Sequence, residues 1–244
     1  MTDRAGNKGV TILQLTCKVR AVEKHYEELH MPTSVDVAQS IYPQSDGQPM
    51  ADNTKQFRWI VTIQGGLDAL WRGDPQVFVA GDLFWYPVEG HPEICMAPDV
   101  LVAFGRPKGD RGSYLQWEEG GIAPQVVFEI RSPGNTVAVM TRKFRFYERY
   151  GVEEYYLYDP DTGELSGWQR QGETLEEVEP MEGWVSPRLG VRFERDRGEL
   201  QLYRPDGERF ATYVELMEQR EQEHQRAERL AARLRALGID PEGA

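Results

Sequence analysis

The sequence has few of the residues that build disulfide frameworks, redox sites and zinc sites. It contains two cysteines, Cys17 and Cys95, and four histidines among 244 residues. Two cysteines without CxxC spacing are too few for the disulfide framework of a small secreted protein. The histidines do not show the spacing of a zinc site. We therefore expect free, buried thiols and no histidine-based or cysteine-based metal centre.

Long hydrophobic runs are also absent. No apolar segment approaches the ~20 residues that a membrane-spanning helix needs. The first residues, MTDRAGNKGVTILQLTCKVR, lack the apolar centre and small-residue cleavage site of a secretory signal. These absences predict a cytoplasmic protein that does not contact membranes.

The third deficit is positive charge. Lysine and arginine together number 28 against 40 aspartates and glutamates, which gives a net charge of −12. Indiscriminate binding to nucleic acid needs concentrated Lys and Arg, so the balance disfavours it but leaves room for a local basic face. A phosphate-cradling GxxxxGK[ST] motif is also missing from the sequence.

The remaining composition is that of a protein with a real core, since 40% of the residues are hydrophobic and 28% are charged. We divide the chain into a poorly defined extension (1–45), a main domain (46–205) and a charged C-terminal helix (206–244). Within the extension, VTILQLTCKV alternates like a strand and AVEKHYEEL could form a short helix.

The main domain begins with a predicted helix from Thr54 to Trp71, which has apolar residues at 57, 60, 63, 67, 70 and 71 and Asn53 or Thr54 as its N-cap. Gly65 and Gly66 weaken this helix by ~1 kcal/mol each relative to Ala, unless another group packs closely there.

Three strand-like segments follow: QVFVAGDLFWYPV, PDVLVAF and QVVFEI. A helix comes next, NTVAVMTRKFRFYERY, with Asn135 as the expected cap and Gly151 as the C-terminal glycine. VEEYYLYD is the next strand, and a strand, helix and strand joined by short loops imply a parallel pair. Hairpin-like strands continue to about Tyr203. The predicted fold is α/β (an α+β mixed sheet) with flanking helices.

The C-terminal segment from Glu208 to Leu237 is helical in pattern and highly charged. Its apolar stripe is too patchy for a coiled coil. A helix folded on the body and a helix that forms a homodimer both remain open.

Two carboxylates interrupt the apolar strand segments. Glu129 lies in VVFEI, which is apolar without alternation and therefore typical of a strand covered on both faces. Asp99 opens VLVAF. A buried carboxylate is costly unless it is paired, hydrogen-bonded or bound to a metal. A salt bridge or a strand-end position near solvent would explain either residue alone, but the pair suits Mg²⁺ or Mn²⁺.

Lys143 is an independent signal. At ~100° per residue it projects into the apolar half of its helix, between Met140 and Tyr147, as the only charged residue there. Its head could escape to solvent, or it could lie beside the carboxylates. Nearby cations that could contact phosphate are Arg131, Arg142 and three residues of the long loop 105–124, namely Arg106, Lys108 and Arg111.

The order Pro98-Asp99, VVFEIRSPGN and RKFRFYERYGVEEYYLYDP resembles the Uma-two family of nucleases, which belongs to the PD-(D/E)XK superfamily. The resemblance covers roughly residues 46–169 and also includes the charged C-terminal helix. It implies a restriction-endonuclease-like core in which Asp99 and Glu129 hold a metal. It also implies that Lys143 replaces the lysine that usually follows two residues after the glutamate, where this sequence has Arg131. The superfamily often adds an acidic residue near the first helix, and Asp46 and Asp52 are candidates.

The first hypothesis is therefore a metal-dependent DNA endonuclease. Asp99, Glu129 and the backbone carbonyl of Ile130 would hold Mg²⁺ or Mn²⁺, and Lys143 would orient the attacking water. The alternative is a catalytically idle nuclease-like module that binds nucleic acid or a protein partner. A hydrolase of smaller phosphates or nucleotides is a third reading.

Overall fold

The structure is a computed structural model that describes residues 41–45, 47, 51–238 and 240. The chain divides into two compact units, residues 1–42 and 43–244. Only Ile41 and Tyr42 of the first unit are described, so the strand and helix predicted within the extension lie outside the described residues.

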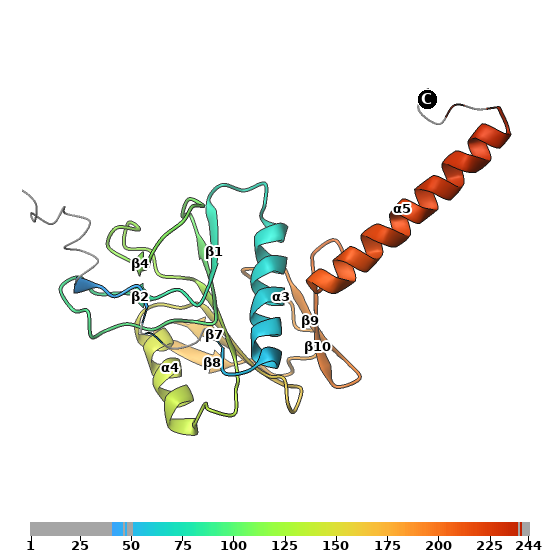
Figure 1. The fold of residues 1–244 in the computed structure, drawn as a ribbon. Helices are drawn as coiled ribbons and strands as arrows, with labels where there is room; N and C mark the ends of the chain where they lie inside the picture. The colour runs from blue at the N-terminus through green and yellow to red at the C-terminus, as the bar shows by residue number, and fades with distance from the viewer. Residues whose placement is uncertain (1–40, 46, 48–50, 239, 241–244) are drawn as a thin grey trace, which may run out of the picture. The chain divides into compact units, whose positions relative to one another are not determined.

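A six-stranded mixed sheet forms the centre of the second unit (Figure 1). The strand order is β1-β3-β5-β6-β7-β8. The parallel pair is β5–β6, and the other neighbours are antiparallel. This confirms the predicted mixed sheet and the parallel pair that flanks the helix. The strands are β1 (Val77–Gly81), β3 (Val100–Phe104), β5 (Val126–Ile130), β6 (Glu154–Asp159), β7 (Glu164–Gln171) and β8 (Thr174–Glu177).

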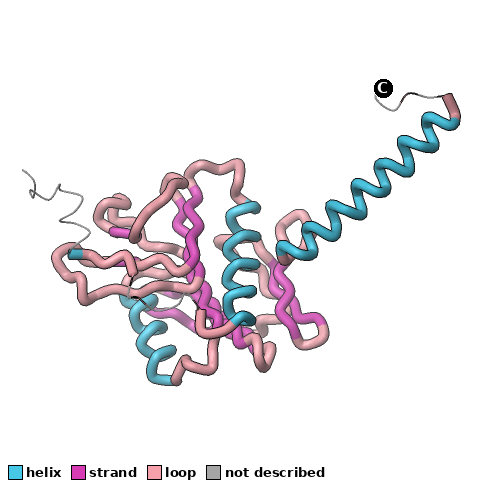
Figure 2. The backbone as a smooth tube through the Cα atoms, in the orientation of Figure 1, coloured by secondary structure: helices cyan, strands magenta, loops and turns pink. Residues whose placement is uncertain are grey.

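Two helices cover opposite faces of the sheet: α3 (Thr54–Leu70) and α4 (Val137–Arg149) (Figure 2). Side chains alternate along each strand, so Val126 and Phe128 of β5 pack in the core beneath α3, while Val127 packs in the core beneath α4. Both faces of β5 are therefore covered, as its continuous apolar sequence predicts.

The helix ends follow local capping chemistry. The Asn53 side chain accepts a hydrogen bond from the Gln56 amide at 2.8 Å, which confirms Asn53 as the N-cap of α3. Thr136, not Asn135, caps α4 by accepting from the Val139 amide. Asn135 instead accepts from the Ser132 amide and so stabilises the preceding turn. Gly151 follows α4 with φ +95°, a conformation that favours glycine.

Smaller elements complete the unit. The predicted strand at 76–88 is divided, because Asp82 adopts φ +47° after β1 and the chain re-forms as β2 (Trp85–Tyr86), which pairs with β4 (Tyr114–Leu115). β9 (Arg192–Asp196) and β10 (Glu199–Tyr203) form a hairpin. α5 (Tyr213–Ala236) has a capping box and no buried residue. No helix in the described part of the chain is long and apolar enough to cross a membrane.

A buried carboxylate joins the segment before β9 to the sheet. The Glu154 side chain on β6 is 1% exposed and accepts hydrogen bonds from the Tyr156 hydroxyl at 2.9 Å, the Arg188 amide at 2.8 Å and the Ser186 hydroxyl. Burial raises the pKa of Glu154, while these three donors oppose the rise.

The two adjacent glycines of α3 give a matched test of packing. A methyl group at Gly66 would overlap the Phe210 ring, whereas one at Gly65 would meet no atom within 4 Å. We expect Gly65→Ala to raise the free energy of unfolding by about 0.5–1 kcal/mol through helix propensity. Gly66→Ala should lower it by about 1–3 kcal/mol through overpacking. Urea denaturation measures both, and equal effects of the two substitutions would contradict this packing.

Glu154 predicts a pH dependence of stability. Because its folded pKa is raised, the folded protein retains a proton that the unfolded chain releases near its ordinary value of 4.5. The resulting stabilisation is complete below that value and is lost as pH rises through the folded pKa. Glu154→Gln should therefore gain stability relative to the wild type as pH rises above about 4.5, by at most about 1.4 kcal/mol per pH unit. The control is Glu176→Gln, which removes an exposed carboxylate from β8. Parallel pH profiles of the wild type and Glu154→Gln would refute the assignment.

Candidate active site

Three carboxylates lie level with one another at one end of the sheet. Val100 pairs with Gly81 on β1 and with Phe128 on β5. Continuing both registers by one residue places Asp99 opposite Asp82 on one side and Glu129 on the other. The Asp82 amide donates to the Asp99 carbonyl at 3.2 Å, which extends the β1–β3 ladder to this level.

Asp99 and Glu129 face the helix α4. By strand alternation they share the face of Leu101 and Val127, which pack in the core beneath α4. The two residues are 6% and 1% exposed, so neither is a solvated strand-end charge. Such burial requires partners for both carboxylates.

Lys143 supplies the charge partner. Its Nζ lies 2.6 Å from Oε2 of Glu129, and the Lys143 side chain is 15% exposed. The ammonium therefore reaches the carboxylate and does not escape to solvent. Burial opposes its charged form, but Glu129 and Asp99 outweigh this effect and raise the pKa of Lys143. Lys143 is thus a permanent cation and hydrogen-bond donor at neutral pH.

Tyr147 holds the other oxygen of Glu129. It lies one helical turn after Lys143 on α4, and its hydroxyl donates to Oε1 of Glu129. Burial, reinforced by Glu129, raises the pKa of Tyr147 well above its usual value, so the group remains a neutral donor. Both oxygens of Glu129 are therefore oriented by side chains of α4.

Asp99 is held from the opposite direction. Its Oδ2 accepts from the Ile130 amide at 2.6 Å, and the Ile130 carbonyl accepts from the Gln56 side chain at 3.0 Å. Burial, with the nearby charge of Glu129, raises the pKa of Asp99 to about 8, although the charge of Lys143 and hydrogen bonding to Asp99 from the Ile130 amide and the Gln56 side chain oppose the rise.

The donor chemistry suits a hydrated Mg²⁺ or Mn²⁺ ion. A carboxylate offers about four lone-pair sites, and the contacts above leave acceptor capacity on Asp99, Glu129 and the Ile130 carbonyl. Over the described ranges, no group of three or more His, Cys, Asp or Glu residues could hold an ion by itself. Mg²⁺ commonly binds through one or two carboxylates and retains several waters, so this donor set fits it.

An open cleft of about 950 Å³ leads to this site. Its lining includes Asp99, Lys143 and Arg142, so the structure brings Arg142 to the predicted site. Arg131 does not line the cleft. β5 ends at Ile130, and the Arg131 guanidinium pairs with Asp159 on β6 at 3.2 Å.

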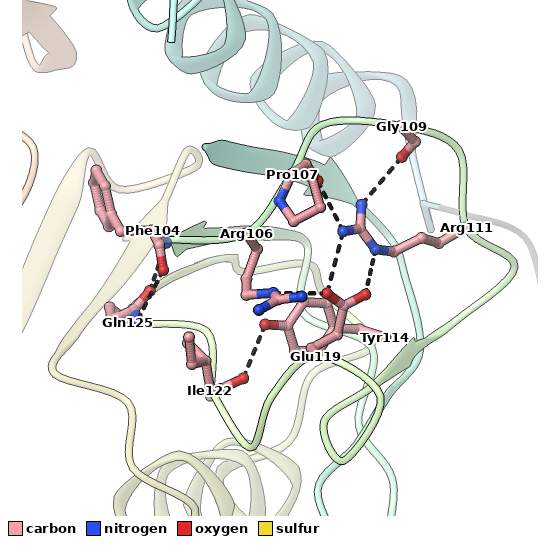
Figure 3. Close-up of polar contacts among 9 residues, drawn as sticks. All are labelled: Phe104, Arg106, Pro107, Gly109, Arg111, Tyr114, Glu119, Ile122 and Gln125. Atoms are coloured by element: carbon pink, nitrogen blue, oxygen red, sulfur yellow. Dashed lines mark hydrogen bonds and ion pairs between the residues drawn. The ribbon is translucent and has the colours of Figure 1, made fainter. Parts of the chain in front are cut away.

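The three cations of the loop 105–124 are engaged elsewhere. Arg106 and Arg111 both pair with Glu119 (Figure 3). The Arg111 guanidinium also lies 3.9 Å from the centre of the Phe78 ring. Lys108 pairs with Asp68 at 2.7 Å. None of the three lines the cleft. In this structure they order the loop.

Sequence reasoning missed Gln56, Tyr147 and Asp82 as site residues. Gln56 had a detectable signal, because it shares the buried stripe of Ile60 and Ile63, whereas Phe57 is 48% exposed. Tyr147 is a polar group four residues from Lys143 on the same face. Asp82 depends on strand register, which the sequence does not reveal.

The two acidic candidates near the first helix have different outcomes. Asp52 lines the cleft and accepts from the Ser132 hydroxyl. Asp46 lies outside the described residues.

A comparison with protein-family models agrees with the resemblance. Residues 48–192, more than half of the chain, match the Uma2 (Uma-two) family, whose description is "Putative restriction endonuclease". The chain is also similar to a crystal structure at 1.96 Å of a "putative nuclease belonging to DUF820" from Anabaena variabilis ATCC 29413. The TM-score is 0.41 at 16% identity, over 59% of this chain and 79% of that chain. A search of curated proteins finds no match.

The buried ion pair predicts an asymmetric effect of charge removal. Lys143→Met leaves the Glu129 carboxylate buried without its cation, so we expect the free energy of unfolding to fall by about 3–5 kcal/mol. Arg142→Met removes the same charge from an exposed neighbour and should change stability by less than about 0.5 kcal/mol. The double variant Lys143→Met/Glu129→Gln should recover much of the loss. Equal stabilities of the two single variants in chemical denaturation would contradict the pairing.

Proposed function

This chain belongs to the Uma2 family, and we propose that it is a metal-dependent nuclease that hydrolyses DNA phosphodiester bonds at Asp99, Glu129 and Lys143. The observation that carries the proposal is the position of Lys143. Its ammonium contacts Glu129 from an otherwise apolar helix face and lines the same cleft as Asp99. A purely structural cation would not need to lie on the wall of an open cleft beside two buried carboxylates.

The metal would be held by Asp99, Glu129 and the carbonyl of Ile130. When bound, Mg²⁺ or Mn²⁺ supplies Lewis-acid polarisation of a phosphoryl oxygen and acidifies water. The protein prepares these ligands before binding. Lys143 and Tyr147 orient the two oxygens of Glu129, while Gln56 orients the Ile130 carbonyl. Metal ligands in proteins are typically oriented by hydrogen bonds from neighbouring groups in this way.

Lys143 would act as a donor and not as a base. One of its three N–H groups is directed to Glu129, and the others are available to orient the attacking water or to stabilise charge on the phosphate. Its raised pKa keeps the ammonium charged throughout the neutral range. Arg142, exposed at the cleft, would contact a phosphate of the substrate.

The idle module remains the second candidate, and one observation favours it. Both oxygens of Glu129 already accept hydrogen bonds from the protein, so the pair is stable without an ion. Calorimetric titration with Mg²⁺ and Mn²⁺ separates the candidates. A nuclease binds the ion at millimolar concentrations or below, whereas the idle module does not.

Removal of either carboxylate tests the proposed function. We expect Asp99→Asn and Glu129→Gln to reduce cleavage of DNA by about 10²–10³-fold or more and to abolish the heat of Mn²⁺ binding. The matched control is Glu154→Gln, which removes a carboxylate as buried as that of Glu129 but held by Tyr156, Ser186 and Arg188. Cleavage at the wild-type rate by either site variant, with the fold intact by circular dichroism, would overturn the proposal.

A further inference from the structure

α4 presents a stripe of arginines to the cleft. Arg142, Arg145 and Arg149 all line it, and all three are exposed. Their spacing of three and four residues places them along one side of the helix, and Lys143 lines the same cleft. The stripe therefore begins at the candidate catalytic residues and continues toward the C-terminal end of α4.

These arginines are not neutralised within the described part of the chain. None of the three takes part in an ion pair, and Arg149 makes one cation–π contact, 5.6 Å from the Tyr150 ring centre. By contrast, Arg106, Arg111 and Arg131 are each paired with a carboxylate. In a chain of net charge −12, an uncompensated stripe that lines a cleft is suited to an anionic ligand.

The rest of the cleft lining has a different character. The segment 82–97 contributes apolar side chains, among them Phe84, Ile94 and Met96, together with the carboxylates of Asp82 and Glu93. Phe146 of α4 and Tyr150, the residue that follows the helix, also line the cleft and add aromatic surface. One side of the cleft can thus hold a phosphate backbone, and the remainder can accept bases but not a second backbone.

We infer that the cleft binds one unpaired polynucleotide strand, with its phosphates on Arg142, Arg145 and Arg149 and its bases on the apolar lining. A duplex carries two backbones, and the second would meet the carboxylates of Asp82 and Glu93. Single-strand sites combine a basic track with aromatic surfaces in this way. This inference rests on the proposed function, because it identifies the nuclease substrate as a single strand or an unpaired end.

The length of the stripe is consistent with a short contact. At 1.5 Å per residue, Arg142 and Arg149 are about 10 Å apart along the helix axis. A strand stacked as in duplex DNA rises 3.4 Å per nucleotide and would place about three nucleotides over this distance. The arginines would therefore hold the nucleotides that flank the phosphate at Lys143. The chemistry is shared by DNA and RNA, because the contacts involve phosphates and base faces.

Fluorescence anisotropy in the presence of EDTA tests binding without hydrolysis. The probe is a labelled oligothymidylate of about 20 nucleotides, longer than the ~4–16 nucleotides of common single-strand sites. A matched duplex and an oligouridylate are the comparison ligands. The variant is Arg145→Ala/Arg149→Ala. The control, Arg58→Ala/Arg72→Ala, removes two exposed arginines outside the cleft. All proteins are full-length chains.

We expect the cleft variant to bind oligothymidylate at least about tenfold more weakly than the control. The salt slope of log K should be reduced by about 1.4, or 0.7 for each lost phosphate contact. The duplex should bind at least about tenfold more weakly than the single strand. Tighter binding of oligouridylate supports the proposal with RNA as the ligand. Binding of oligothymidylate that is as tight as, or tighter than, that of oligouridylate supports the proposal with DNA as the ligand.

Duplex binding as tight as single-strand binding, or equal affinities of the cleft and control variants, would overturn the inference. If these results appear while the wild type still cleaves duplex DNA with metal, the proposed function stands and this inference fails. If strand binding depends on the arginines but Glu129→Gln cleaves like the wild type, this inference stands and the proposed function fails.

Discussion

The contact between Lys143 and Glu129 is the interaction on which the site depends. A carboxylate with 1% exposure needs compensation, and the 2.6 Å ion pair provides it from the neighbouring helix. The same contact fixes α4 over the end of β5, and Tyr147 then orients the second oxygen of Glu129. Asp99 is fixed by the Ile130 amide, directly beside Glu129 in the strand. A small set of contacts therefore holds two acidic groups and a cation together at an end of the sheet that is open to a cleft.

Much of this site can be predicted from the sequence, because burying a charged residue in an apolar segment costs free energy unless a partner compensates it. Asp99, Glu129 and Lys143 each break such a pattern, and the structure brings them together. Gln56 also interrupts an apolar pattern, that of α3, but the exposed Phe57 makes the solvent-facing side of this helix look apolar in the sequence. Arg131 is predicted as a phosphate contact, but its guanidinium pairs with Asp159 and does not line the cleft. Asp82 lies level with Asp99 only through strand register, which depends on pairing between distant segments.

The fold, too, can be predicted from the sequence only in part. Apolar patterns and capping residues predict α3, β5, α4 and the parallel β5–β6 pair, because these features are local or follow from short connections. The division of the segment 76–88 into β1 and β2 depends on the left-handed conformation of Asp82. Whether an arginine is available to bind an anion depends on its contacts in the folded chain, which the sequence does not reveal. Arg106 and Arg111 both form ion pairs with Glu119, whereas the arginines of α4 are not paired within the described residues, although all belong to one acidic chain.

The most direct test of the central claim is a crystal structure of the protein soaked in Mn²⁺, with the ion located by its anomalous scattering. The account predicts one peak in contact with a carboxylate oxygen of Asp99 and one of Glu129, with the Lys143 ammonium directed at a water of the ion. No peak at this position at millimolar Mn²⁺, with the Lys143–Glu129 pair unchanged, would contradict it.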